Sequence, residues 1–136
     1  MHFQLDSLAA TKALAQYLIE QTRVGDLIIL SGPLGAGKTT LTQAIAELLG
    51  SSASVTSPTY TLIHEYPSQG GLIVHIDAYR LGIAEKLFDL GLEDYLDRAR
   101  LVLVEWGEAL EPLFPEAIVV RLKLEEDRRE AEVIQT

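Results

Sequence analysis

The 136-residue chain is long enough for one domain with a single hydrophobic core and too short for two lobes, so we expect residues 1–136 to form one domain. Hydrophobic residues make up 48% and charged residues 23%, a balance that excludes an intrinsically disordered protein. The formal net charge of −9 disfavours direct binding to nucleic acid, because an acidic surface repels the phosphate backbone.

The chain contains no cysteine, which excludes disulfides, thiolate nucleophiles and cysteine-ligated zinc. Residues 1–6 lack the basic segment and the apolar run of a signal peptide. The longest apolar stretches are far too short to span a membrane. We therefore expect a cytoplasmic protein that makes no membrane contact.

A first helix is expected to follow Asp6 or Ser7, either of which can cap its amino terminus, and to run to about Thr22. Its expected inner face consists of Leu8, Leu14 and Leu18. After Gly25, the segment Asp26–Ser31 is predicted to be a strand that is apolar on both faces, as in a sheet covered by helices on each side.

A second helix is expected to begin near Lys38 and to end at Gly50, which stands where a C-terminal cap belongs. The inner positions at helical spacing are Leu41, Ala44, Ile45 and Leu48. Residues 51–58, rich in serine and threonine, are expected to form a loop.

Five further strands and one or two short helices are predicted in the rest of the chain. The strands are residues 60–66, 72–77, 101–105, 117–124 and 129–134, the last two antiparallel to each other. Residues 83–98 are expected to be helical, with a break at Gly91. Strands interleaved with helices predict a single-domain α/β fold with a mixed central β-sheet flanked by α-helices.

The spacing G-x-x-x-x-G-K-[ST] is met by Gly32, Gly37, Lys38 and Thr39, between a predicted buried strand and an amphipathic helix. Glycines permit the backbone conformations in which successive N–H groups point at an anion, and the N-terminal end of the next helix adds its dipole. We expect Lys38 to reach the β- and γ-phosphates of ATP and the Thr39 hydroxyl to bind Mg²⁺. The sequence thus predicts a P-loop NTPase fold.

Two predicted strands end in a carboxylate, Asp77 and Glu105. Either can hold Mg²⁺ or its waters across from Thr39, because Mg²⁺ prefers oxygen ligands. We assign Asp77 to the metal and Glu105 to the attacking water, although one of the two could simply be a solvated carboxylate at a strand end.

The use of the nucleotide is not specified by a P-loop alone. The chain has no asparagine, so it lacks the Asn-Lys-x-Asp loop with which GTPases read guanine, and no D-x-x-G switch follows Asp77. A small-molecule kinase and a nucleotide-sensing binding module without useful turnover remain alternatives to an ATPase.

Four blocks in order along the chain carry a family resemblance: GPLGAGKTT (32–40), SPTYTL (57–62), HIDAYRL (75–81) and VEWGE (104–108). The first is common to P-loop proteins, and together they strongly resemble the bacterial TsaE family. The resemblance implies an ATP-hydrolysing accessory subunit for the threonylcarbamoyladenosine modification of tRNA, next to the anticodon. It also implies partnership with the TsaD and TsaB proteins, with tRNA contacted only indirectly, because TsaD performs the transfer.

The motif and the resemblance together define the expected site. The expected catalytic residues are Lys38, Asp77 and Glu105, and the metal ligands are Thr39, Asp77 and Glu105. The expected nucleotide-binding residues are Gly35, Ala36, Gly37, Lys38, Thr39, Thr40, Thr59 and Trp106. Thr59, preferred over Thr56, belongs to a block that resembles a nucleotide-sensing switch. Pro33 departs from the acidic residue common in the family and is expected only to stiffen the loop.

Some residues have an ordinary interpretation as well as a functional one. Trp106, the single tryptophan, is either a core or rim aromatic or a wall beside the catalytic carboxylate. Arg80, which follows a predicted strand, is interpreted as a structural or interfacial residue rather than a catalytic one. His64 and His75 lack metal-ligand spacing and are interpreted as ordinary strand residues. Residues 125–130, a run of charges, are expected to be a solvated turn.

Overall fold

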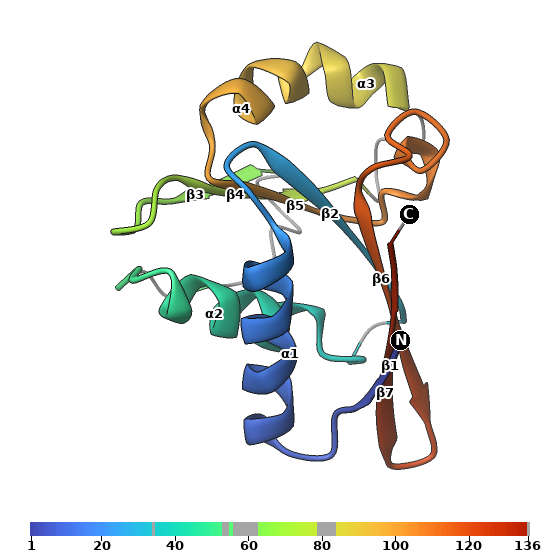
Figure 1. Ribbon diagram of the computed structural model, residues 1–136. Helices are drawn as coiled ribbons and strands as arrows, with labels where there is room; N and C mark the ends of the chain where they lie inside the picture. The colour runs from blue at the N-terminus through green and yellow to red at the C-terminus, as the bar shows by residue number, and fades with distance from the viewer. Residues whose placement is uncertain (34, 53–54, 56–62, 79–83, 136) are drawn as a thin grey trace.

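Figure 1 shows the computed structural model of the chain, which describes residues 1–33, 35–52, 55, 63–78 and 84–135. The elements in chain order are β1 (His2–Gln4), α1 (Leu8–Gln21), β2 (Asp26–Ser31), α2 (Lys38–Leu48), β3 (Ile63–Tyr66), β4 (Ile73–Asp77), α3 (Ala84–Asp89), α4 (Leu92–Arg98), β5 (Leu101–Glu105), the 3-10 helix η1 (Glu108–Leu110), β6 (Ile118–Glu125) and β7 (Arg128–Ile134). None of these helices is long and apolar enough to cross a membrane.

The described strands form one sheet in the order β1-β7-β6-β2-β5-β4-β3. The four central strands β6, β2, β5 and β4 are parallel to one another, whereas β3 pairs antiparallel with β4, and β7 pairs antiparallel with both β6 and β1. The predicted mixed sheet flanked by helices is therefore confirmed. The parallel centre brings the carboxyl ends of β2, β4 and β5 to the same edge of the sheet, where α/β proteins bind ligands.

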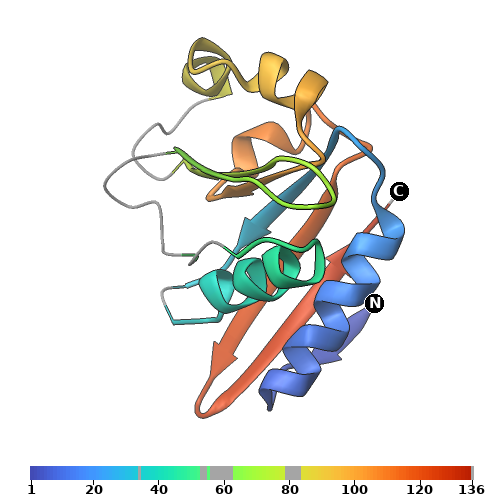
Figure 2. The same cartoon turned by 90° about the vertical axis from the view of Figure 1, so that its left-hand side faces the viewer.

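Helices cover both faces of the sheet. In Figures 1 and 2, α1 and α2 lie on one face, and α3 and α4 lie on the other. Alternate residues of β2 divide between the two layers: Ile28 and Leu30 join the core under α1 and α2, while Leu27 and Ile29 join the core under α3 and α4. A strand buried on both faces must be apolar throughout, which explains the sequence pattern.

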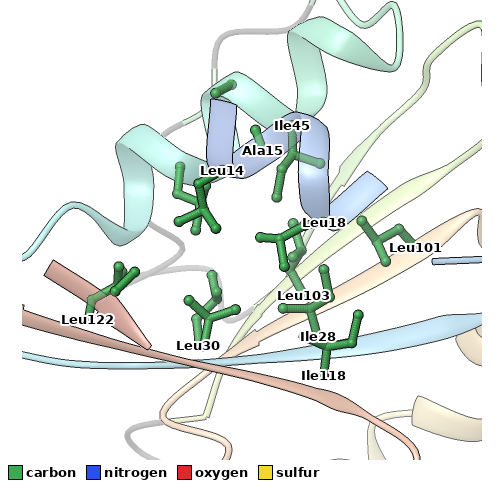
Figure 3. Close-up of a cluster of buried hydrophobic side chains, with 14 of the residues drawn as sticks. Leu14, Ala15, Leu18, Ile28, Leu30, Ile45, Leu101, Leu103, Ile118 and Leu122 are labelled. Atoms are coloured by element: carbon green, nitrogen blue, oxygen red, sulfur yellow. The ribbon is translucent and has the colours of Figure 1, made fainter. Parts of the chain in front are cut away.

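The larger core lies beneath α1 and α2, which pack against each other (Figure 3). Leu14 and Leu18 of α1 and Ile45 of α2 face Ile28, Leu30 and Leu103 of the sheet. These side chains are fully buried. The packing fixes α2, and with it the loop before α2, against the edge of β2.

Most predicted elements are confirmed with small shifts at their ends, and Ser7 is the observed cap of α1, accepting a hydrogen bond from the Ala10 N–H at 3.1 Å. Two inner-face predictions are wrong. Leu8 lies in the first turn of α1 and is 59% exposed, and Leu48 lies in the last turn of α2 and is 45% exposed. A residue at a helix end has a neighbouring helical turn on one side only, so its side chain can remain exposed. Helical periodicity alone therefore predicts burial wrongly at such positions.

The short strand β1 was not expected. It pairs with β7, with Phe3 opposite Ala131, and extends the sheet by one edge strand. Three residues are too few for a period-2 pattern to be distinguished from a coil, so only the pairing reveals the strand.

Candidate functional site

A cleft of about 1300 Å³ opens at the carboxyl edge of the parallel strands. Three regions distant in sequence line it: the segment around the start of α1, the glycine-rich loop with the start of α2, and the tip of the β6–β7 hairpin. Asp77 at the end of β4, Glu105 at the end of β5 and Trp106 after it complete the lining. The lining residues used below are Ser7, Leu8, Gly35, Gly37, Lys38, Thr39, Thr40, Asp77, Glu105, Trp106 and Arg129. The predicted site residues that the structure describes thus share one cavity.

The glycine-rich loop leaves β2 with a backbone that only glycine adopts easily. Gly32 has φ +144°, Gly35 φ +83° and Gly37 φ +106°. At Gly32 a Cβ atom would also lie 2.5 Å from the carbonyl oxygen of Leu122 in β6, so no side chain fits between the loop and the neighbouring strand. Within the loop, the buried Ala36 donates its N–H to the Pro33 carbonyl at 3.1 Å.

Helix α2 begins directly at Lys38, with Gly37 as its cap. Gly37 offers no side chain to the free N–H groups of the first turn, and Thr39 and Thr40 line the cleft beside them. Unpaired N–H groups and the positive end of the helix dipole make such a helix start favourable for an anion.

Lys38 is buried, at 7% exposure, among groups that satisfy its ammonium. Its Nζ donates to the Gly32 carbonyl oxygen at 2.6 Å, lies 3.9 Å from Glu105 Oε1 and stands 4.1 Å from the ring centre of Trp106. Burial lowers the pKa of Lys38, while the negative charges of Glu105, Asp77 and Glu108 act in the opposite direction.

Asp77 and Glu105 lie directly opposite each other as the last residues of the paired strands β4 and β5. Both are largely buried, at 7% and 4% exposure, and both line the cleft. Two carboxylates held side by side form an oxygen-rich corner of the cleft that Thr39 also lines, consistent with the ligand preference of Mg²⁺.

Trp106 follows β5 and contacts both the hydrophobic core and the cleft. Its backbone has φ +61°, uncommon for a large residue, and its N–H donates to the Leu30 carbonyl at 3.1 Å. The half-buried indole packs against the core under α3 and α4, and its ring also contacts the Lys38 ammonium. Trp106 is therefore at once a rim aromatic and a wall of the cleft.

His75 is not an ordinary strand residue. It is fully buried in β4, and its Nε2 lies 2.5 Å from Glu105 Oε2. Residues two apart on a strand share a face, so His75 lies on the same face as Asp77. The two-residue spacing between His75 and Asp77 could be read from the sequence. The contact of His75 with Glu105 on β5 could not, because it depends on strand order and register. The metal interpretation stays disfavoured.

The β6–β7 hairpin borders the cleft as well. The charged run predicted to be a solvated turn over residues 125–130 is exposed, but only residues 126–127 form the turn, because two residues are enough to join antiparallel strands. Arg129, in β7, reaches back to the glycine-rich loop. Its Nε donates to the Gly35 carbonyl oxygen at 3.1 Å. No pattern in the sequence indicates this contact, because it depends on β6 lying next to β2.

Three residues singled out in the sequence, Thr56, Thr59 and Arg80, lie outside the described residues. Among the described residues, no group of three or more histidine, cysteine or acidic side chains is arranged to hold a metal ion.

Fold and cleft define an α/β protein with one mixed sheet and an anion-favouring site at the carboxyl edge of its parallel strands. The sequence model of the threonylcarbamoyl adenosine biosynthesis protein TsaE matches residues 5–133. The chain belongs to the TsaE family, whose members are tRNA threonylcarbamoyladenosine biosynthesis proteins.

Individual relatives match over most of their length. The TsaE protein of Haemophilus influenzae is 40% identical over 125 residues, which is 90% of this chain and 79% of the relative. That of Rickettsia conorii is 36% identical over 133 residues, 96% of this chain and 75% of the relative. The crystal structure of Bacillus subtilis YdiB superposes with a TM-score of 0.72 at 32% identity, covering 96% of this chain and 82% of that one.

Proposed function

We propose that the chain is a P-loop protein that binds and hydrolyses Mg-ATP as an accessory subunit in the threonylcarbamoyladenosine modification of tRNA, working with TsaD and TsaB. The observation that carries the proposal is the convergence of Lys38, Asp77 and Glu105 on one cleft at the glycine-rich loop. Family membership supports the tRNA modification.

The cleft suits a nucleotide in both size and polarity. Its phosphate end is the start of α2, with free N–H groups, the Lys38 ammonium and the hydroxyls of Thr39 and Thr40. The start of α1, including the exposed Leu8, lines the same cleft, and Arg129 stands beside the glycine-rich loop, where its Nε donates to the Gly35 carbonyl oxygen. An apolar side chain such as Leu8 suits a base, Arg129 adds positive charge near the phosphates, and a volume of about 1300 Å³ leaves room for all three parts of ATP.

The donor set also fits Mg²⁺. Thr39, Asp77 and Glu105 supply only oxygen, and such a small set of protein ligands matches an ion that Mg-dependent enzymes hold jointly with substrate phosphates. When bound, Mg²⁺ would neutralise charge on the phosphates. Asp77 is our choice for the metal side and Glu105 for the water.

The chain's own residues would act through position and charge. Lys38 would exchange the Gly32 carbonyl for phosphate oxygens, where its charge stabilises the negative charge that increases in the transition state. Glu105, with one oxygen toward Lys38, would orient the attacking water and accept its proton. Trp106 would restrict the access of other water molecules to this corner.

The partner proteins explain how an acidic subunit could serve tRNA modification. At a net charge of −9, the chain is not suited to grip tRNA itself, so TsaD and TsaB would supply the contact with RNA. ATP hydrolysis by this subunit would drive the cycle of the complex, while the threonylcarbamoyl transfer takes place on TsaD.

The first test is phosphate release from Mg-ATP by the full chain, with and without TsaD and TsaB. We expect slow release by the chain alone and a clear change with the partners. Lys38→Ala should lower release by about a hundredfold or more, because it removes a cation aimed at the transition state. Lys12→Ala, at an exposed position of α1, is the matched control and should leave release unchanged.

The alternatives give different results in the same assay. Transfer of labelled γ-phosphate to a metabolite, with little free phosphate, would identify a kinase. Nucleotide-dependent affinity for the partners that survives Glu105→Gln, without turnover, would identify a sensor. Wild-type rates in Lys38→Ala would show that the site is elsewhere.

A further inference from the structure

We propose that His75 is a positioning residue for Glu105, and that a hydrogen-bonded chain across β3, β4 and β5 holds it in place. This inference rests on the proposed ATPase function, in which Glu105 orients the attacking water. The chain consists of His64 and Tyr66 on β3, His75 on β4 and Glu105 on β5.

The register of the sheet explains why these four side chains meet. His64 lies directly opposite His75, and Tyr66 is two residues from His64 on the same face. On the other side of β4, Glu105 pairs with Asp77, so it is the diagonal neighbour of His75. All four side chains therefore project on the face of the sheet that α1 and α2 cover.

The two oxygens of Glu105 have different partners. Oε2 lies 2.5 Å from His75 Nε2, in a fully buried contact, whereas Oε1 lies 3.9 Å from Lys38 Nζ on the cleft side. Anchoring one oxygen to a buried ring fixes the plane of the carboxylate. The other oxygen is then held toward the place where the terminal phosphate and the water would lie.

The donors and acceptors form one consistent sequence that ends at the carboxylate. An ionised carboxylate only accepts, so Nε2–H of His75 donates to Glu105. In a neutral His75 ring, Nδ1 is then the acceptor, and the Tyr66 hydroxyl, 3.4 Å away, donates to it. The Tyr66 oxygen in turn accepts from His64 Nδ1 at 3.0 Å. Each group orients the next, as second-layer partners do in other catalytic sites.

A purely structural role for His75 is the competing explanation. However, β4 is otherwise apolar up to Asp77, and a leucine at position 75 would fill a core position without burying polar nitrogens. A polar residue kept inside such a strand breaks the local pattern, which in natural proteins is expected at functional positions. The contact with a cleft carboxylate supplies the function.

The test measures kcat and KM for ATP hydrolysis by the full chain with its partner proteins. We expect His75→Leu to lower kcat by about 10- to 100-fold, the usual cost of losing a second-layer partner. The KM for ATP should change by no more than about twofold, because the contacts to the phosphates remain. His75→Gln, whose amide can still donate to Glu105, should recover part of the rate, and Tyr66→Phe should lower kcat less than His75→Leu does.

The chain offers a matched control, since His2 pairs with Glu132 at 3.5 Å on the exposed edge of the sheet. His2→Gln removes a histidine–glutamate contact between two residues that do not line the cleft, and it should leave kcat and KM unchanged. Thermal unfolding of each variant separates loss of fold from loss of positioning. Folded His75→Leu with a wild-type kcat, in an assay where Glu105→Gln is impaired, would overturn the inference and leave the proposed function standing.

A second measurement is independent of turnover. In the proton NMR spectrum of the full chain, the His75 Nε2–H should give a far-downfield resonance that disappears in His75→Gln and moves in Glu105→Gln. If no such resonance exists, or if Glu105→Gln leaves it in place, His75 does not hold Glu105. If the resonance behaves as expected but wild-type chain with partners releases no phosphate, the proposed function fails and the positioning of Glu105 serves some other reaction.

Discussion

Lys38 shows how one side chain serves two opposing demands. The proposed function needs its ammonium to be available for phosphates, yet the side chain is buried, held by the Gly32 carbonyl and close to Glu105 and Trp106. Burial disfavours the charge more than the nearby carboxylates favour it, so the pKa of Lys38 is lowered from its ordinary value of 10.5. A cation whose charge is disfavoured by burial in this way is ready to exchange its neutral carbonyl partner for a more negative one.

This lowered pKa makes folding stability depend on pH. Between the lowered pKa of folded Lys38 and 10.5, the unfolded chain binds more protons than the folded chain, so the contribution of Lys38 to the free energy of unfolding rises with pH. We expect the difference in this free energy, wild type minus Lys38→Met, to increase as the pH is raised toward 10.5. Urea unfolding without nucleotide, at several alkaline pH values, measures it.

Lys12→Met, at an exposed position of α1, controls for the simple loss of one positive charge in the same experiment. A difference between wild type and Lys38→Met that falls with rising pH would contradict the prediction. It would mean that the carboxylates around Lys38 outweigh the cost of its burial.

At the scale of elements, the glycine-rich loop is shaped by the strand beside it as much as by its own sequence. Gly32 combines φ +144° with a Cβ position only 2.5 Å from the Leu122 carbonyl oxygen. The loop therefore turns from β2 against β6 before it reaches α2. The β6–β7 hairpin contacts the loop a second time through Arg129 and the Gly35 carbonyl.

Gly32→Ala should therefore lower both stability and nucleotide affinity. The matched control is Gly91→Ala before α4, where φ is +95° but nothing lies within 4 Å of the added Cβ. We expect Gly91→Ala to cost about 1–2 kcal/mol through its backbone alone and to leave ATP binding unchanged. Gly32→Ala should cost more and weaken ATP binding by about tenfold or more, since moving the loop misplaces the phosphate-binding N–H groups.

Urea unfolding gives the stabilities, and titration with a fluorescent ATP analogue gives the affinities. Equal losses of stability in the two variants would show that the contact with β6 relaxes without cost. Undiminished nucleotide binding by folded Gly32→Ala would argue against the loop as the phosphate site.

At the scale of the whole molecule, the negative net charge disfavours binding to a long polyanion such as tRNA. The cleft concentrates cationic groups at Lys38 and Arg129, but twenty acidic residues against eleven basic ones leave the molecule negative as a whole. The proposed binding of ATP is compatible with this net charge, because the helix dipole and the lysine act at short range. A negative molecule cannot attract a long polyanion over its surface.

We therefore expect the chain alone to bind tRNA more weakly than about 10⁻⁴ M at physiological salt, the weak end of non-specific binding. Fluorescence anisotropy with labelled tRNA, repeated over a range of salt concentrations, measures this affinity. The same titration with TsaD and TsaB present is the positive control. Micromolar binding by the chain alone that weakens as salt rises would contradict the indirect role of tRNA.

The sequence by itself determined most of the elements and the residue types of the cleft. Apolar runs such as Asp26–Ser31 need burial on both faces, so helices on both sides of a mixed sheet followed from the apolar pattern and the order of the elements. The glycine spacing before Lys38 and the carboxylates at the ends of two strands also needed no tertiary information, because each follows from local conformation and residue type. Helix ends were less well determined, as Leu8 shows, since burial there depends on what lies beyond the helix.

Only the tertiary structure decided which distant residues meet. The order β6-β2-β5-β4 and the register between β4 and β5 bring His75 to Glu105, and the pairing of β6 with β2 brings Arg129 to Gly35. Strand order is set by the packing of whole layers and leaves no periodic signal in any one segment. For that reason the sequence identified Lys38, Asp77 and Glu105 by type, while their buried histidine partner became visible only in the folded sheet.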